Sequence, residues 1–417
     1  MRAAATFAAL LLVSCTLPVL AEEPAGWNQW AGPLSNGTSP ATDVFRGGFR
    51  LREVWRRPAD GGISALAVAG ERLFSLASAE GNDYAFALDA GTGKEIWRVA
   101  LGASVPAMEY GAASTPATDG RRVYLHTPQC RLLALEAATG KTAWQHDLRA
   151  EYNTGAMASG CWSSPLLDGD LLILQVNGEP DKRVMAFDKA SGAVAWSSPG
   201  RSRSTRSSPL IADLAGVRQV VVHDVEKGKG GLYGLRLKDG ALLWSLRFAE
   251  GESFANDTPL PLGDDRVGII TWSDFRAVRV TRKGEAWEAA PAWSSRDFRA
   301  EVQPVTLHAA AAGQHVYGYG GENLSCLEAA TGKPAWKEKI YPGSLILVDG
   351  HLVALSQSSG LLRVLEATPA GYREKARQEV FTPGAISDTP PSFAGRRIYL
   401  RNSEEMVALE VVREGSR

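Results

Sequence analysis

The fold is decided by a stretch that recurs along the chain, Ala87-Leu88-Asp89-Ala90-Gly91-Thr92-Gly93-Lys94-Glu95-Ile96-Trp97. The same pattern returns as Ala134-Leu135-Glu136-Ala137-Ala138-Thr139-Gly140-Lys141-Thr142-Ala143-Trp144, and almost unchanged from Cys326 to Trp336. Looser copies end at Trp196, Trp244 and Trp287, and weaker ones lie at Val364–Tyr372 and Val407–Glu410. Self-similarity at a regular spacing is the signature of a repeat architecture.

Each copy has the residues of a tight β-hairpin. A short apolar strand ends at an acidic residue, and a glycine supplies the positive φ of the turn before the next strand begins. The tryptophan after that glycine is a large apolar anchor that can pack onto the neighbouring unit. We therefore predict a structural docking role for the repeated tryptophans, which are Trp55, Trp97, Trp144, Trp196, Trp244, Trp287 and Trp336.

Two further strand signals precede each copy. One is a branched or aromatic run such as Leu171–Leu174, and the other is a Ser/Thr-Pro pair such as Thr115-Pro116 or Ser164-Pro165. Proline is tolerated at the start of an edge strand, so these pairs indicate an edge. Each unit then has four strands, and eight units over the mature chain give about 49 residues per unit, close to the length of a β-propeller blade.

Closure of the ring is also predicted. The last unit lacks its tryptophan strand, and Leu51-Arg52-Glu53-Val54-Trp55 at the other end of the chain can supply it. Pairing the two ends removes an open sheet edge. The prediction is an all-β protein, a single eight-bladed β-propeller of four-stranded antiparallel blades at residues 49–412, with its last blade closed by the N-terminal strand. Residues 22–48 form an N-terminal extension that packs over the side or base of the propeller, and 413–417 form a C-terminal tail.

The first residues indicate export. Residues 1–21 combine Arg2, an apolar run from Ala3 to Val13 and small residues before Glu22, as in a secretory signal peptide. A competing interpretation takes Leu12-Val13-Ser14-Cys15 as a lipoprotein signal, in which Cys15 is acylated and begins the mature chain. Both interpretations place the protein in the periplasm or outside the cell, and only the second attaches it to a membrane.

Composition excludes several classes of protein. The 417 residues carry 45 Lys and Arg against 46 Asp and Glu, a net charge of −1, which argues against a nucleic-acid partner. Hydrophobic residues at 45% fit a globular chain. Cysteines are too few for a disulfide-built scaffold, and none are spaced as metal or redox pairs.

The repeat resembles the tryptophan-docking motif of the PQQ-like β-propeller family, over about residues 27–412. That family includes quinoprotein alcohol dehydrogenases, a propeller lipoprotein of the outer-membrane β-barrel assembly machinery, and secreted PQQ-like repeat proteins whose start resembles Trp27–Pro33 of this chain. The motif is a packing device, so the resemblance implies the fold more strongly than an activity.

Catalytic chemistry is not predicted. Family dehydrogenases hold the quinone PQQ with a ring-packing tryptophan, a disulfide between adjacent cysteines and a calcium ion, and this chain has no adjacent cysteine pair. The six histidines have no metal-ligand spacing, and no G-x-S-x-G motif is present. We expect no catalytic residue, metal or cofactor, with PQQ and calcium as the alternative.

A binding site, if present, is expected where the tryptophan strands connect to the next inner strands around one mouth of the channel. Loops on a rigid scaffold often carry recognition, and tryptophan and arginine are typical anchors. The candidate residues of this binding mouth are Glu109, Tyr110, Trp162, Arg201, Arg203, Arg206, Asn256, Asp257, Trp293, Arg296, Asp297 and Arg299. The three arginines from Arg201 to Arg206 can pair with carboxylates of a peptide or small acid.

Cys130 and Cys161 are expected on the same face, one in a hairpin turn and the other at the start of the next inner strand. In an oxidising compartment we predict a disulfide between them, whereas Cys326 lies inside a strand as a buried thiol. The function predicted is a non-catalytic, monomeric binding scaffold with an envelope or extracellular protein partner, in outer-envelope protein assembly. Two alternatives stay open: a quinone-binding oxidoreductase or cofactor carrier, and an interaction module of an extracellular complex.

Overall fold

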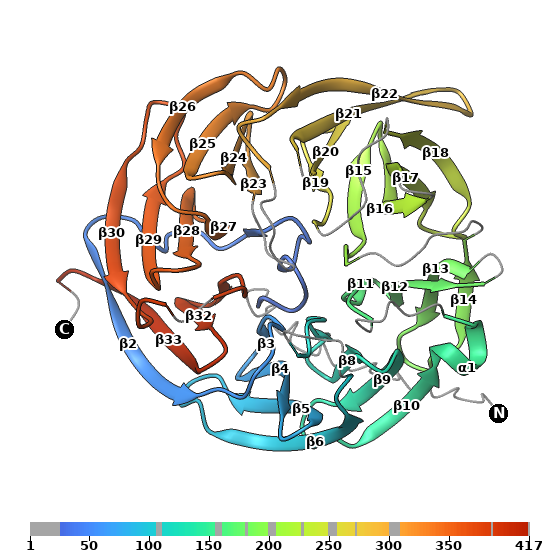
Figure 1. Ribbon diagram of the computed structural model, residues 1–417, viewed down its shortest axis with the longest axis horizontal. Helices are drawn as coiled ribbons and strands as arrows, with labels where there is room; N and C mark the ends of the chain where they lie inside the picture. The colour runs from blue at the N-terminus through green and yellow to red at the C-terminus, as the bar shows by residue number, and fades with distance from the viewer. Residues whose placement is uncertain are drawn as a thin grey trace, which may run out of the picture.

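A computed structural model describes residues 26–105, 111–154, 161–179, 182–198, 206–226, 229–248, 257–271, 273–299, 309–384 and 387–415. These residues form eight antiparallel blades arranged around a central axis, as predicted (Figure 1). Each blade has four strands, and one sheet gains a fifth, β1 (Thr38–Ser39), from the N-terminal segment. Within the described ranges α-helix is confined to α1 (Leu148–Tyr152), and no helix there is long and apolar enough to cross a membrane.

The first four blades each begin with the strand nearest the channel and continue outward. Blade 1 contains β3 (Ala67–Ala69), β4 (Arg72–Ala79), β5 (Asn82–Asp89) and β6 (Glu95–Ala103); blade 2 contains β7 (Ala117–Thr118), β8 (Arg122–His126), β9 (Arg131–Glu136) and β10 (Thr142–Asp147). Blade 3 contains β11 (Leu166–Asp168), β12 (Leu171–Gly178), β13 (Lys182–Asp188) and β14 (Val194–Ser197); blade 4 contains β15 (Leu210–Leu214), β16 (Val217–Glu226), β17 (Lys229–Arg236) and β18 (Leu242–Arg247).

The other four blades follow the same order. Blade 5 contains β19 (Leu260–Pro261), β20 (Arg266–Ile270), β21 (Phe275–Lys283) and β22 (Ala286–Ser295); blade 6 contains β23 (Ala309–Ala312), β24 (His315–Gly320), β25 (Asn323–Glu328) and β26 (Pro334–Lys339). Blade 7 contains β27 (Gly343–Val348), β28 (His351–Ser356), β29 (Leu361–Glu366) and β30 (Glu374–Glu379); blade 8 contains β31 (Ser392–Ala394), β32 (Arg397–Arg401), β33 (Glu405–Arg413) and β2 (Phe49–Pro58).

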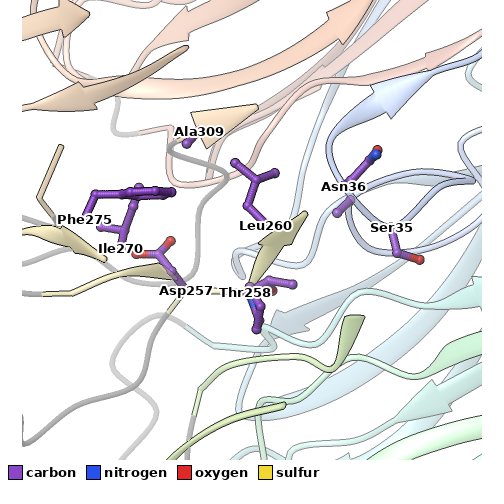
Figure 2. Close-up of a pocket in the computed structure, with 10 residues that line it drawn as sticks. Ser35, Asn36, Asp257, Thr258, Leu260, Ile270, Phe275 and Ala309 are labelled. Carbon is purple, nitrogen blue, oxygen red and sulfur yellow. The ribbon is translucent and has the colours of Figure 1, made fainter. Parts of the chain in front are cut away.

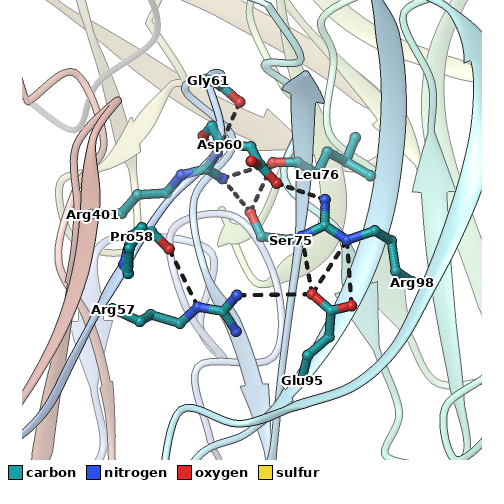
Figure 3. A network of polar contacts seen from close by, with 9 residues as sticks. All are labelled: Arg57, Pro58, Asp60, Gly61, Ser75, Leu76, Glu95, Arg98 and Arg401. Carbon is teal, nitrogen blue, oxygen red and sulfur yellow. Dashed lines mark hydrogen bonds and ion pairs between the residues drawn. The ribbon is translucent and has the colours of Figure 1, made fainter. Parts of the chain in front are cut away.

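The ring closes by pairing of the two chain ends. Strand β2 runs antiparallel to β33 from Phe49 opposite Arg413 to Pro58 opposite Glu405, which confirms the predicted closure. Arg401 adds a second tie between blades 8 and 1 (Figure 3). Its buried guanidinium donates to the Ser64 and Leu76 carbonyls, the Ser75 hydroxyl, and the carbonyls of Asp60 and Gly61. Burial lowers the pKa of Arg401 to about 10, so the side chain stays charged at neutral pH.

Six seams between neighbouring blades share the predicted docking contact. In each, an indole N–H of one blade donates to a carbonyl in the hairpin turn of the next blade, as Trp55 does to Ala90 at 3.0 Å. In five of the six a turn glycine also lies against the ring, as at Gly93, which has φ +70° and where a Cβ would lie 2.7 Å from Trp55. Only glycine satisfies both conditions. In the turn of blade 7, Gly371 has no such contact. The other five pairs are Trp97 with Ala137, Trp144 with Lys189, Trp196 with Leu237, Trp293 with Ala329, and Trp336 with Thr368.

Trp287 does not dock as predicted, and Trp293, predicted at the binding mouth, takes that role in blade 5. The docking residue follows directly after a β-bulge in the outermost strand, and in blade 5 this bulge lies between Pro291 and Trp293 because the β21–β22 hairpin is longer than the others. Trp287 lies near its tip, packs on the core between blades 4 and 5 and carries Arg282 over its ring. Trp244 also departs: its N–H donates to Gln219 of its own blade, 2.6 Å away.

The N-terminal segment closes one end of the channel. Its backbone or side chains bond to the inner strands of several blades, with Val68 donating to the Trp27 carbonyl and Thr118 to the Asn28 carbonyl. Further round the ring, β1 pairs in parallel with β27, while the indole of Trp30 extends along the channel and donates to Thr258, which precedes β19 at the other end. Trp27 and Trp30 are buried. We call residues 26–39 the plug, and the end of the channel that they fill the base.

Candidate binding face at the channel mouth

The mouth is the end of the channel opposite the plug, where the inner strands begin. There the Ser/Thr-Pro pairs link neighbouring blades by hydrogen bonds. The Ala65 N–H donates to the Thr115 hydroxyl, the Thr115 N–H to Ser164, and the Ser164 N–H to Ser208. In each of these bonds a backbone N–H of one blade donates to the hydroxyl of the Ser/Thr-Pro pair in the next blade. This chain of hydrogen bonds forms a frame that links blades 1 to 4 at the mouth.

Behind that frame, equivalent positions on the second strands carry buried polar side chains. In each second strand, the position lies two residues after the residue that pairs with the first residue of the inner strand. It holds His126 in blade 2, Gln175 in blade 3, His223 in blade 4 and Arg401 in blade 8. The Nδ1 of His126 is 2.7 Å from the Ser163 carbonyl at the start of blade 3. Burial lowers the pKa of both His126 and His223 to about 4, so both rings are neutral at pH 7.

Trp162 lies at the mouth and is buried. The guanidinium of Arg206 lies 4.3 Å from the centre of its ring, a cation–π contact between the starts of blades 3 and 4. The disulfide predicted between Cys130 and Cys161 is present and ties the residue before Trp162 to the β8–β9 turn of blade 2. Cys326 is a buried free thiol, as predicted.

Two more arginine–aromatic stacks extend this surface across blades 3 to 5. Arg183 lies 5.1 Å from the ring centre of Tyr233, and Arg276 lies 5.0 Å from that of Phe248. The fully buried carboxylate of Asp224 lies 2.6 Å from Arg183 and 2.5 Å from Arg247, and a buried charge of this kind needs such partners. Sequence patterns did not single out these arginines, because they lie inside the strands or at their ends rather than in the connections.

Asp257 faces the channel rather than solvent. It is 5% exposed and lines a narrow cavity with room for about one water-sized group. Figure 2 shows it beside Ile270 and Phe275, with Ser35 and Asn36 of the plug on the opposite side. The cavity therefore has one carboxylate, small polar groups from the plug, and an apolar wall.

Other candidates are dispersed. Asp297 pairs with Lys337 on the outermost strand of blade 6 at 3.0 Å, so it lies at the outer rim of the mouth face. Arg296 and Arg299 are exposed in the same connection. The candidates Glu109, Tyr110, Arg201, Arg203 and Asn256, together with Cys15, lie outside the described residues.

One exposed aromatic residue escaped prediction. Tyr341 is 59% exposed in the connection from β26 to β27, on the mouth face. It lies just after the strand that carries Trp336, so its position in the repeat could have placed it in a connection at the mouth. Over the described ranges no three His, Cys, Asp or Glu side chains gather as a metal site.

A family model described as outer membrane protein assembly factor BamB matches residues 50–177 and 82–294. Together the two ranges cover more than half of the 417 residues. The chain belongs to the PQQ-like β-propeller family. Its membership explains the repeated tryptophan docking and leaves the chemistry of the mouth to be argued from its own residues.

Relatives within this family have two different kinds of function. Outer membrane protein assembly factor BamB of Yersinia pestis is 26% identical over 282 residues, which is 64% of this chain and 67% of that protein. A polyvinylalcohol dehydrogenase of Pseudomonas sp is 22% identical over 388 residues, 76% of this chain, but the match spans only 56% of the dehydrogenase.

Solved structures agree on the fold. BamB from Moraxella catarrhalis superposes with a TM-score of 0.61 at 15% identity, covering 88% of this chain and 99% of that one. A quinohemoprotein alcohol dehydrogenase from Pseudomonas putida HK5 gives a TM-score of 0.66 at 12% identity, covering 93% and 80%. At these identities the likeness shows the propeller fold and nothing further.

Proposed function

We propose that this protein is a non-catalytic, exported propeller scaffold that binds a protein partner in outer-membrane protein assembly through its mouth face. The observation that carries the proposal is the match of residues 50–294 to the family model of an assembly factor. The Yersinia pestis relative is matched over similar shares of both chains, 64% of this one and 67% of that one. The sequence also has no adjacent cysteine pair of the kind used by family dehydrogenases. In its more specific form, the proposal is that an acylated Cys15 anchors the protein to a membrane.

The chemistry of the mouth face supports a protein partner. Arg206 and Arg276, each half-buried over an aromatic ring, place positive charge on the mouth face, and arginine is suited to binding the carboxylates or backbone carbonyls of a partner. The exposed ring of Tyr341 adds an amphipathic contact residue on the same face. Arginine and tyrosine are enriched at the centres of protein interfaces.

In-cell photocrosslinking tests this proposal. A photoreactive residue replaces Tyr341 on the mouth face, and in a second strain it replaces Ile96, which is 44% exposed on β6 near the base. We expect a discrete adduct with an outer-membrane assembly protein from position 341 and none from position 96. The absence of any protein adduct from position 341, or equal adducts from both positions, would contradict it.

A matched pair of charge reversals locates the contact. Arg206→Glu breaks the stack on Trp162 at the mouth, whereas Arg282→Glu breaks an equivalent stack on Trp287 near the base. We expect only Arg206→Glu to lower the adduct yield from position 341. Equal loss in both variants would point to general destabilisation instead.

The quinone-binding alternative has its own measurement. Purified protein is mixed with PQQ and calcium, passed through a desalting column and examined for absorbance of the quinone. We expect none to co-elute with the protein. Bound chromophore at a stoichiometry near one would favour the cofactor-carrying relatives as the functional guide.

A further inference from the structure

The seam between blades 7 and 8 lacks the tryptophan contact for a topological reason. Docking requires a hairpin turn between the third and outermost strands of the receiving blade. In blade 8 these strands are β33 and β2, which come from opposite ends of the chain, so no turn joins them. Blade 7 correspondingly carries Ala376 where the docking indole would lie: Ala376 follows the bulge of β30 and opposes Val364, as Trp336 follows the bulge of β26 and opposes Cys326 in blade 6.

A short piece of the N-terminal segment, Asp43–Phe45, spans the two blades at this seam. The backbone N–H groups of Val44 and Phe45 donate to the Asp349 carboxylate in the β27–β28 turn of blade 7, at 2.8 and 3.0 Å. From blade 8, the Arg396 guanidinium donates to the carbonyls of Asp43 and Val44, at 3.0 and 2.9 Å. The same three residues are therefore bonded to both blades at once.

The aromatic ring of Phe45 is buried at this seam and contacts both blades. It is 3% exposed, and its centre lies 5.0 Å from the ring of Phe49 on blade 8 and 4.9 Å from that of His351 on blade 7. Arg56 makes another contact across the seam by donating to the Val380 carbonyl, but it is exposed and contributes no buried apolar area like that of Phe45.

We propose that Asp43–Phe45 is a latch that locks the ring at the one seam where closure by the two chain ends removes the docking turn. The latch follows directly from the plug, so the segment that fills the base of the channel is also the one that holds blades 7 and 8 together. Arg46, Gly47 and Gly48 join it to β2 and are exposed, which makes the latch a separable strap rather than part of a strand.

Hydrogen–deuterium exchange of the exported chain tests the latch. In Phe45→Ala we expect peptides from β28 to β32 to exchange about tenfold faster or more, because each tenfold corresponds to about 1.4 kcal/mol of lost local stability. Peptides from blades 2 and 3 should keep their rates. Trp144→Ala is the matched control, since it removes the indole at the seam between blades 2 and 3 and should accelerate exchange there instead.

An unchanged exchange rate in blades 7 and 8, or an equal increase of the rate in all eight blades, would overturn the proposal. Should Phe45→Ala fail to fold, Asp349→Gly removes only the carboxylate that holds the latch. Glycine adopts the φ of +47° at that position without strain, so the same regional pattern is expected at smaller size. Adding Ala376→Trp to Phe45→Ala should not restore protection, because no turn receives the indole; restored protection would refute the role assigned to the missing turn.

Discussion

The two buried histidines make a quantitative prediction about acid stability. Burial lowers the pKa of His126 from 6.5 to about 4, and the ring is 2% exposed, so no correction for solvent screening applies. The unfolded chain binds a proton near pH 6.5, whereas the folded protein resists protonation until pH 4. The stabilising effect is therefore complete above about pH 6.5 and is lost as the pH falls toward 4.

The size of the effect follows from the shift. One pKa unit corresponds to about 1.4 kcal/mol, so protonation of one such histidine in the unfolded chain lowers the free energy of unfolding by about 2 kcal/mol at pH 5. The loss reaches about 3 kcal/mol at pH 4. His223, with the same pKa and burial, contributes a similar amount. Together they predict that the propeller weakens steeply between pH 6.5 and 4.

The perturbation is His126→Gln, because Gln175 already occupies the equivalent position in blade 3. Urea unfolding is measured for wild type and variant at pH 7.5 and pH 5. The variant is expected to lose about 2 kcal/mol less than wild type between the two pH values, whatever its stability at pH 7.5. His315→Gln, at the half-buried start of β24, serves as the control.

Comparing pH dependence separates titration from packing, since a packing defect shifts both measurements equally. An identical loss of stability in wild type and His126→Gln would refute the reasoning, because the imidazole would then not be the group that titrates. A large effect in His315→Gln would refute it equally.

Three further predictions concern the packing of the blades. Gly93→Ala should destabilise by about 2 kcal/mol or more in thermal or urea unfolding, because its Cβ meets an indole, whereas Gly81→Ala, with similar φ and open space, should cost about 1 kcal/mol. Trp293→Ala should cost about 3 to 5 kcal/mol and Trp287→Ala clearly less, as only Trp293 docks between blades. Cys130→Ser removes a disulfide spanning 31 residues and should cost about 3 to 4 kcal/mol, with thiol titration in denaturant confirming its loss.

The propeller itself could be predicted from local pattern because each blade is built from contacts between neighbouring residues. The Asp89–Trp97 hairpin and the Ser/Thr-Pro starts depend on strand period and turn chemistry within a few tens of residues. The pairing of β2 with β33 could be inferred because the last unit of the repeat lacks one strand. The disulfide was predictable from the phase of the repeat, since the two cysteines lie at the mouth end of neighbouring blades.

The sites that depend on contacts between distant segments required the tertiary structure. Whether Trp287 or Trp293 docks is decided by where the strand bulge lies, and the length of the β21–β22 hairpin sets that position. The rim location of Asp297 depends on Lys337 in the next blade.

The repeat and the number of blades could be read from the sequence because they depend on residues close together in the chain, and the ring closure followed from one strand missing at the end of the repeat. That the N-terminal segment plugs the base and latches blades 7 and 8 emerged from the three-dimensional structure, since Phe45 meets His351 across more than three hundred residues. Likewise, His126 and Arg401 become equivalent only when their strands are aligned around the axis. Burial is a property of the assembled ring, and burial is what gives these groups their altered pKa values.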